Sequence, residues 1–320
     1  MNLPSRSESD QRQRSPLIVI VGPTAVGKTS LALRLGQTLD AEVVSADSRQ
    51  VYRGMDIGTA KPTLEERRLV PHHLIDVVDP DEPFGLAQYQ TMAYAAISDV
   101  LARGRLPLLV GGSGQYVRAV VEGWGIPRVP PDQELRDELY RQAEAQGSEA
   151  LHARLSALDP VAAERIDPRN VRRVVRALEV CLCTGERISD LQRRHPPPYR
   201  ILQIGLTMPR PSLYRRIDER VDRMLAAGLV AEVQSLVARG YDYELPSMSG
   251  LGYRQIGAYL RGEISLDEAV HLIKRETRRF VRQQYNWFRL DDERIRWFDV
   301  EVIPPGEIEA VVREFVGQGG

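Results

Sequence analysis

Short apolar runs and longer segments of helical periodicity alternate along the first part of the chain. The apolar runs that we expect to form strands cover residues 17–22, 41–47, 73–78 and 106–110. Between and after them, apolar positions recur every three to four residues at 29–39 and 86–103, which predicts helices. Strands without polar alternation that are separated by helices are typical of a parallel sheet buried on both faces. The pattern therefore predicts an α/β fold.

The pattern changes after residue 126. From about 131 to 191 the chain is helical in period and rich in arginine, and it contains no strand-like run. A proline run at 196–198 is followed by another apolar strand pattern at 199–207. We therefore predict an all-helical insert, residues 127–198, within a core made of 16–126 and 199–320. Helices at about 211–240 and 266–290 and a strand at 296–300 complete the expected core.

Composition narrows the class of protein. The chain has 320 residues, a formal net charge of -1 and ordinary apolar and charged fractions. No apolar run approaches the ~20 residues that span a bilayer, so we expect no membrane association. Residues 1–15 are polar and lack the apolar segment of a secretory signal, and we interpret them as a disordered leader. With only Cys181 and Cys183, a disulfide framework or zinc site is not expected. We expect a cytoplasmic monomer.

A complete phosphate-binding loop of pattern GxxxxGK[ST] joins the first strand to the first helix. Its residues are Gly22, Pro23, Thr24, Ala25, Val26, Gly27, Lys28 and Thr29. The strand before it and the helix after it separate such a loop from a chance match or a plain glycine turn. Backbone N–H groups and the helix N-terminus attract phosphates, the lysine reaches their oxygens, and the threonine hydroxyl ligates Mg²⁺. The loop predicts a diphosphate group with Mg²⁺, and leaves the identity of the diphosphate open.

Two further candidates follow predicted strands and should lie at the same sheet edge. Asp47 ends the second predicted strand. There it could be a general base, a group that hydrogen-bonds to a ligand of the metal, an acceptor for a substrate hydroxyl, or only a cap of the strand end. Ser48 and Gln50 beside it could contact a polar substrate. Ser113 lies in the glycine turn after the fourth strand, where its hydroxyl could approach an anion or belong to a simple turn.

Arginines cluster in the second half of the chain. Arg172, Arg173 and Arg176 share one predicted helix, and their spacing places several cations on one face. Each cluster alone fits a solvated helix face, whereas several together favour nucleic-acid binding. Arg220, in another predicted helix, could stabilise a leaving diphosphate or form a surface ion pair.

These patterns leave three interpretations. The first is a P-loop kinase of nucleotides or small molecules with an arginine-rich lid. The second is a transferase that uses the loop for a different diphosphate, and the third is a nucleotide-dependent switch that binds RNA.

Longer motifs favour the second interpretation. Besides the phosphate loop, the chain contains SADSRQVYRGMDIGTAKP at 45–62, PHHLID at 71–76, LVGGSGQY at 109–116 and GLGYRQ at 250–255. In this order they resemble the bacterial tRNA dimethylallyltransferases, the tRNA isopentenyltransferase family, over about residues 16–300. The resemblance implies a P-loop NTPase-like core and transfer of a dimethylallyl group from dimethylallyl diphosphate to the adenosine 3′-adjacent to the anticodon. The partners it implies are dimethylallyl diphosphate, Mg²⁺ and the tRNA anticodon stem-loop.

The resemblance also implies roles for particular residues. Asp47 matches the family's general base, Ser113 a substrate-contacting Thr or Ser, and Arg220 an arginine that binds the diphosphate. The phosphate loop holds the prenyl diphosphate in place of ATP. Asp47, Ser48, Arg49 and Gln50 correspond to the segment that contacts the flipped adenosine. Arg136 matches an arginine that contacts tRNA, and the insert is expected to hold the anticodon stem-loop.

Overall fold

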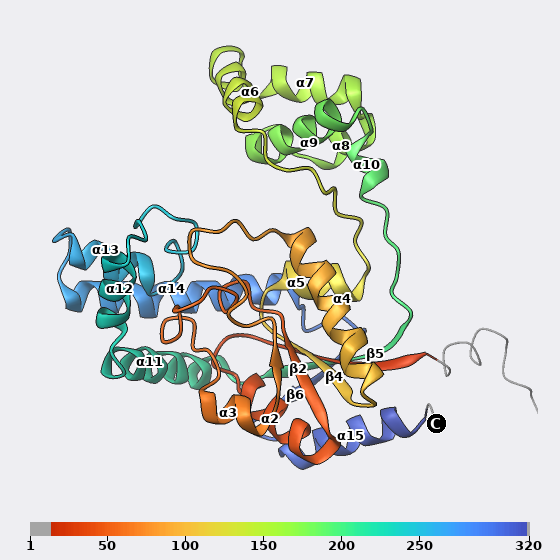
Figure 1. Ribbon diagram of the computed structural model, residues 1–320, viewed down its shortest axis with the longest axis vertical. Coiled ribbons are helices and arrows are strands. Elements are labelled where there is room, and N and C mark those ends of the chain that lie inside the picture. The colour runs from red at the N-terminus through yellow and green to blue at the C-terminus, as the bar shows by residue number, and fades with distance from the viewer. Residues whose placement is uncertain (1–13, 319–320) are drawn as a thin grey trace, which may run out of the picture. The chain divides into compact units, whose positions relative to one another are not determined.

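Residues 14–318 are described by a computed structural model of the chain (Figure 1). The predicted leader, residues 1–15, falls almost wholly outside this range. Contacts divide the chain into two compact units, residues 1–121 with 198–320 and residues 122–197. The second unit interrupts the first between two strands of its sheet. No helix of the described range is long and apolar enough to cross a membrane.

The first unit is built on a six-stranded sheet with the order β3-β2-β4-β1-β5-β6. All the strand pairs are parallel. The strands are β1 (Ser15–Val21), β2 (Ala41–Ser45), β3 (His72–His73), β4 (Leu106–Val110), β5 (Tyr199–Thr207) and β6 (Ile295–Asp299). This arrangement confirms the predicted α/β class with a parallel sheet covered by helices.

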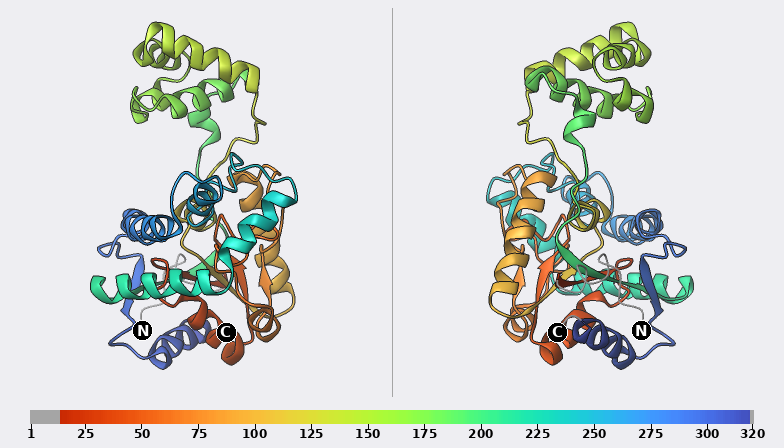
Figure 2. Two further views of the ribbon diagram at one scale, coloured as in Figure 1. Left: turned by 90° about the vertical axis from the view of Figure 1, so that its left-hand side faces the viewer. Right: turned by 90° about the vertical axis from the view of Figure 1, so that its right-hand side faces the viewer.

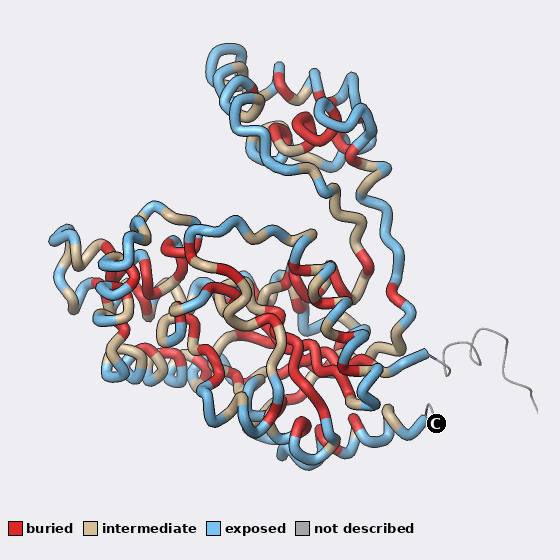
Figure 3. Tube along the Cα trace, in the orientation of Figure 1, coloured by how far each residue is buried: buried red, intermediate tan, exposed pale blue. Residues whose placement is uncertain are grey.

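Both faces of the sheet are buried, as the unbroken apolar runs predict. In β1, Ile18 and Ile20 belong to a core shared with α2 (Lys28–Leu39) and α15 (Pro305–Gly317). The alternate residues of β1, such as Val19, pack on α4 (Leu86–Ala102) and α5 (Gly114–Val121). Figure 2 shows α15 beside α2, and Figure 3 shows the central strands as a buried band.

A third apolar cluster joins the loop after β2 to the carboxyl-terminal helices. These helices are α11 (Arg210–Ala226), α12 (Leu229–Ala238), α13 (Tyr253–Leu260) and α14 (Leu266–Trp287), and the short α3 (Leu64–Leu69) lies between β2 and β3. The predicted single helix at 211–240 is two helices, because Gly228 has a φ of 99° and breaks the turn between them.

The predicted third strand at 73–78 is wrong beyond residue 73. Leu74 and Asp76 have positive φ values of 62° and 56°, which turn the chain away from β2. The N–H groups of Asp76 and Val77 instead donate to the carbonyls of Gln50 and Val51. The apolar residues of this segment therefore pack on a loop, which a local hydrophobic pattern does not distinguish from a strand.

The second unit contains only helices. They are α6 (Gln133–Gln146), α7 (Ser148–Leu158), α8 (Pro160–Arg165), α9 (Val171–Thr184) and α10 (Ile188–Leu191). Its own core includes Leu139, Leu155 and Leu178, all fully buried. The helical character predicted for this region is present, while its assignment to tRNA stays a prediction.

Candidate active site

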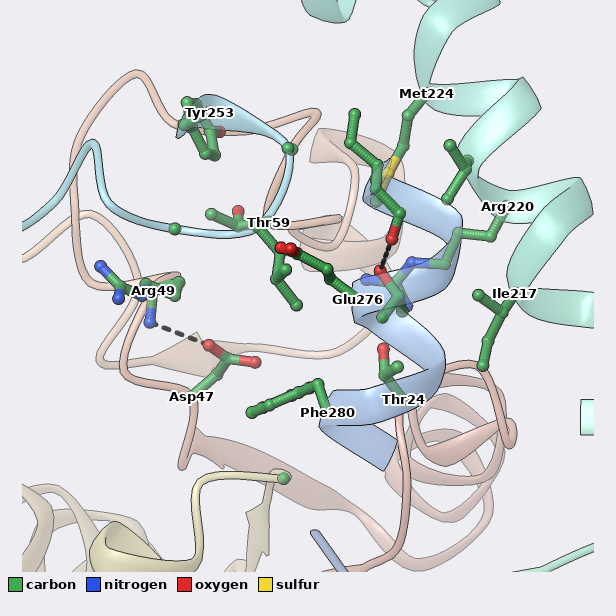
Figure 4. Close-up of a pocket in the computed structure, with 18 of the residues that line it drawn as sticks. Thr24, Asp47, Arg49, Thr59, Ile217, Arg220, Met224, Tyr253, Glu276 and Phe280 are labelled. Atoms are coloured by element: carbon green, nitrogen blue, oxygen red, sulfur yellow. Dashed lines mark hydrogen bonds between the residues drawn. The ribbon is translucent and has the colours of Figure 1, made fainter. Parts of the chain in front are cut away.

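A pocket of about 500 Å³ lies in the first unit, where the loops after β1, β2 and β4 meet α11 and α14. Carboxyl ends of parallel strands are where ligands bind in such sheets. Seven of the site residues predicted from the sequence line it, namely Thr24, Lys28, Asp47, Ser48, Arg49, Ser113 and Arg220. Figure 4 shows the pocket with Asp47 and Arg49 on the loop after β2, Arg220 on α11 and Phe280 on α14.

The phosphate loop has the curled backbone that its sequence predicts. Gly22 and Gly27 have φ values of 142° and 112°, and α2 begins directly after Gly27. A Cβ on Gly22 would lie 2.5 Å from the carbonyl oxygen of Leu206, so no larger residue fits there. The Lys28 ammonium donates to the carbonyls of Gly22 at 2.9 Å and Pro23 at 2.8 Å, which folds its side chain over the loop.

The charges that face the pocket are predominantly positive. Burial and the nearby Arg220 guanidinium lower the pKa of Lys28 to about 8, against a smaller opposing effect of Asp47. Burial also lowers the pKa of Arg220, while Asp47 raises it. Two cations that disfavour one another in an incompletely hydrated site create a strong preference for an anion. This is an environment that a diphosphate would stabilise.

Asp47 lies in the loop two residues after the end of β2, and this loop is linked to the glycine turn after β4. Its carboxylate accepts a hydrogen bond from the backbone N–H of Arg49 at 2.9 Å. The Ser113 hydroxyl accepts from the backbone N–H of Ser48 at 3.0 Å and donates to the Ser48 hydroxyl at 3.2 Å. The sequence-predicted Asp47, Ser48 and Ser113 are therefore brought together, and each lines the pocket.

Arg49 and Gln50 have different environments. Arg49 lines the pocket, and its guanidinium donates to the carbonyls of Pro246 and Ser247. Gln50 is not a lining residue. Its side-chain amide accepts a hydrogen bond from the Ser45 hydroxyl and donates to the carbonyls of residues 59 and 60. Gln50 therefore stabilises the loop that contains these two residues. Direct contact of Gln50 with RNA stays a prediction.

Gln284, a buried residue of α14, also lines the pocket, and no pattern in the sequence predicted its role. Its amide oxygen accepts from the backbone N–H of Thr24 at 2.9 Å, and its nitrogen donates to the carbonyl of Gly112 at 3.2 Å. One side chain therefore fixes the phosphate loop relative to the glycine turn. Gln284 lies 260 residues after Thr24 and 172 residues after Gly112 in the sequence, so no local pattern signals these contacts.

Thr29, the predicted metal ligand, is exposed in the first turn of α2 and is not a lining residue of the pocket. Between residues 14 and 318, no group of three or more His, Cys, Asp or Glu side chains could hold a metal. Mg²⁺ is commonly held by one or two protein ligands together with substrate phosphates. The Thr29 hydroxyl fits a metal of that kind, whose remaining ligands would be phosphate and water.

In the second unit, the predicted tRNA-binding arginines differ in their surroundings. Glu179, fully buried, accepts two hydrogen bonds from Arg136, at 2.8 and 2.9 Å, and one from Arg176 at 2.5 Å. Arg136 and Arg176 thus form a partly buried ion-pair network that ties α6 to α9. Arg172 and Arg173 are exposed on α9. Contact with RNA stays a prediction for all four.

A family model described as IPP transferase matches residues 50–291, and one described as isopentenyl transferase matches 15–72. The chain belongs to the IPP transferase family. It is 62% identical over 274 residues to a protein of Roseiflexus castenholzii named tRNA dimethylallyltransferase, covering 86% of this chain and 90% of that protein. The resemblance inferred from the motifs is thereby confirmed.

Solved structures of the family have the same fold. A full-length tRNA isopentenylpyrophosphate transferase from Bacillus halodurans is 42% identical, with a TM-score of 0.71, and the match covers 96% of this chain and 98% of that one. A eukaryotic dimethylallyltransferase acting on tRNA is 26% identical, with a TM-score of 0.81 and coverage of 95% and 80%. Membership of this family does not favour the interpretation of the chain as a P-loop kinase.

Proposed function

We propose that this chain transfers the dimethylallyl group of dimethylallyl diphosphate to the exocyclic amine of the adenosine 3′-adjacent to the anticodon in tRNA. Diphosphate is the second product. The observation that carries the proposal is the presence of Lys28, Arg220 and Asp47 on the wall of one pocket, in a chain of the IPP transferase family. Two cations and one carboxylate are what the leaving group and the attacking amine of this reaction need.

In the proposed reaction the amine nitrogen bonds to C1 of the dimethylallyl group while the bond from C1 to the diphosphate oxygen breaks. The electron pair of that bond leaves with the diphosphate, where Lys28 and Arg220 would stabilise the added negative charge. The amine proton passes to the Asp47 carboxylate. A positioned general base of this kind typically contributes ~10²–10⁴-fold.

Mg²⁺ is proposed as the metal, and when bound it would supply positive charge to the diphosphate oxygens. Thr29 is the residue proposed to hold it, through its hydroxyl, with the remaining ligands from phosphate and water. The phosphate-loop N–H groups and the N-terminus of α2 would bind the same anion.

The acceptor adenosine must leave its stack to reach this pocket. We propose that Asp47, Ser48, Arg49 and Ser113 contact the extruded base, with Gln50 fixing their loop from behind. The helical unit, residues 122–197, is proposed to hold the anticodon stem-loop, and exposed Arg172 and Arg173 are its candidates for phosphate contact. We also propose that the protein is cytoplasmic and works as a monomer. Sedimentation of the purified protein would test the oligomeric state.

A transfer assay tests the function directly. The protein is mixed with Mg²⁺, radiolabelled dimethylallyl diphosphate and an anticodon stem-loop with adenosine 3′ to the anticodon. The expected result is label in the RNA, and none with a stem-loop that has guanosine there. A parallel tube with ATP and no prenyl donor should show no nucleotide turnover. ATP consumption without RNA labelling would contradict the proposal and restore the kinase interpretation.

A further inference from the structure

Glu232, on α12, collects an unusual set of hydrogen bonds. One carboxylate oxygen accepts from the backbone N–H groups of Asp56, at 3.0 Å, and Ile57, at 2.7 Å. The other accepts from the N–H of Gly58, at 3.1 Å, and from the Tyr253 hydroxyl, at 2.6 Å. Three successive N–H groups that converge on one anion form a backbone nest. The carboxylate is therefore the group around which residues 56–58 are folded.

The loop that Glu232 holds forms part of the pocket wall. Gly58 lines the pocket together with Thr59 and Tyr253, whereas Glu232 does not line it (Figure 4 shows Thr59 and Tyr253). A Cβ on Gly58 would lie 2.5 Å from the Tyr253 ring, so loop and ring are in close contact. Glu232 can thus influence the pocket only through these neighbours.

The same loop continues toward the base candidate. The carbonyls of residues 59 and 60, just after the nest, accept hydrogen bonds from the Gln50 amide at 3.4 and 3.3 Å. Gln50 is three residues after Asp47 on the segment proposed to contact the adenosine. The hydrogen bonds described for Lys28 and for Thr24 of the phosphate loop involve neither Glu232 nor this loop. These hydrogen bonds therefore connect the loop to the segment that carries Asp47.

We propose that Glu232 is a positioning residue for the RNA acceptor, which holds the 56–59 wall and the Tyr253 ring in the geometry that receives the adenosine. The inference rests on the proposed function. Glu232 is proposed to make no contact with substrate. Its effect is proposed to concern binding of the RNA, whereas the phosphate loop organises binding of the diphosphate.

The test substitutions are Glu232→Gln and Tyr253→Phe, with Glu314→Gln as the matched control. The amide has the size of the carboxylate but replaces an acceptor by a donor, so it opposes at least one of the four donors. Tyr253→Phe removes only the hydroxyl donor and leaves the ring against Gly58. Glu314 is an exposed carboxylate on α15 that accepts from Gln318, and it lies outside the pocket lining.

For Glu232→Gln we expect kcat/KM for the RNA to fall by about 10- to 100-fold, because a donor left unpaired carries a cost of that order. The dissociation constant of dimethylallyl diphosphate, measured without RNA, should change by less than about threefold. The double variant with Tyr253→Phe should be little worse than Glu232→Gln alone, since the hydroxyl acts through the carboxylate. Amide hydrogen exchange at 56–58 should speed up in Glu232→Gln and remain unchanged in Glu314→Gln.

Four outcomes would overturn the inference. Equal losses for RNA and diphosphate would make Glu232 a general support of the fold, and unchanged RNA kinetics would remove its role. If Glu232→Gln does not fold, additive losses from Tyr253→Phe and Glu232→Asp would count against it. Absence of RNA labelling by both the unsubstituted protein and Glu314→Gln would instead refute the proposed function, and the inference with it.

Discussion

The charge state of Lys28 gives a prediction that depends on the geometry of the pocket. Burial and Arg220 lower the pKa of the lysine from 10.5 to about 8. This difference corresponds to ~3 kcal/mol, since each unit of pKa corresponds to ~1.4 kcal/mol. The surroundings of Lys28 therefore disfavour its charged form by that amount, and we expect a bound diphosphate to return the lysine pKa toward its ordinary value.

The sign follows from which form of the lysine binds the ligand. Well below pH 8 Lys28 is already charged, so affinity for the diphosphate should be constant. Above pH 8 the empty protein loses the proton that the complex keeps, and affinity should fall about tenfold for each pH unit. Between pH 6.5 and 9.5 the dissociation constant should thus rise about 30-fold, of which ~15-fold falls between pH 8 and 9.5.

Calorimetric titration with dimethylallyl diphosphate in the absence of RNA measures this directly, at constant ionic strength from pH 6.5 to 9.5. The terminal phosphate of the ligand ionises near pH ~6, so its own charge changes little above pH 7. Lys28→Met should bind weakly at every pH, with a flat profile. Arg220→Gln should bind less tightly, but its decline should begin above pH 8, because removal of the neighbouring cation raises the lysine pKa.

A flat profile for the unsubstituted protein up to pH 9.5 would refute the reasoning. So would a decline that persists in Lys28→Met, since the titrating group would then lie elsewhere.

Other predictions concern the base, the phosphate loop and the helical unit. Asp47→Asn should abolish transfer in the labelling assay while RNA affinity, measured by filter binding, stays within about threefold; retained turnover would exclude the base assignment. Gln284→Leu should lower the free energy of unfolding by about 2–4 kcal/mol in urea titrations, because the N–H of Thr24 and a buried carbonyl lose their partner. An unchanged midpoint would mean that water replaces the amide. Replacement of Arg172 and Arg173 by Gln should reduce the salt slope of RNA affinity by about two, and an unaltered slope would remove them from the interface.

The phosphate loop, the strands around it and the placement of Asp47 at the carboxyl edge of the sheet were predictable from the sequence, although β2 ends at Ser45 and not at Asp47 as predicted. Each depends on local features, such as a glycine pattern after an apolar strand or an acid at its end, and the parallel topology then brings strand ends to one edge. The helical character of 131–191 was predictable for the same reason, since periodicity is a local property.

The partners of the polar side chains were decided only by the tertiary structure. Gln284 reaches the phosphate loop over 260 residues of chain, and Glu232 reaches the 56–58 nest over about 175. Arg176, which its charge cluster assigns to a helix surface, is paired with the buried Glu179, and so is Arg136, which the family resemblance assigns to tRNA contact. The segment after His73 has a strand-like pattern but turns into a loop. The sequence determines which polar groups need hydrogen-bond or ion-pair partners. The tertiary structure determines which residues those partners are, because distant segments meet only after the sheet and its helices have packed.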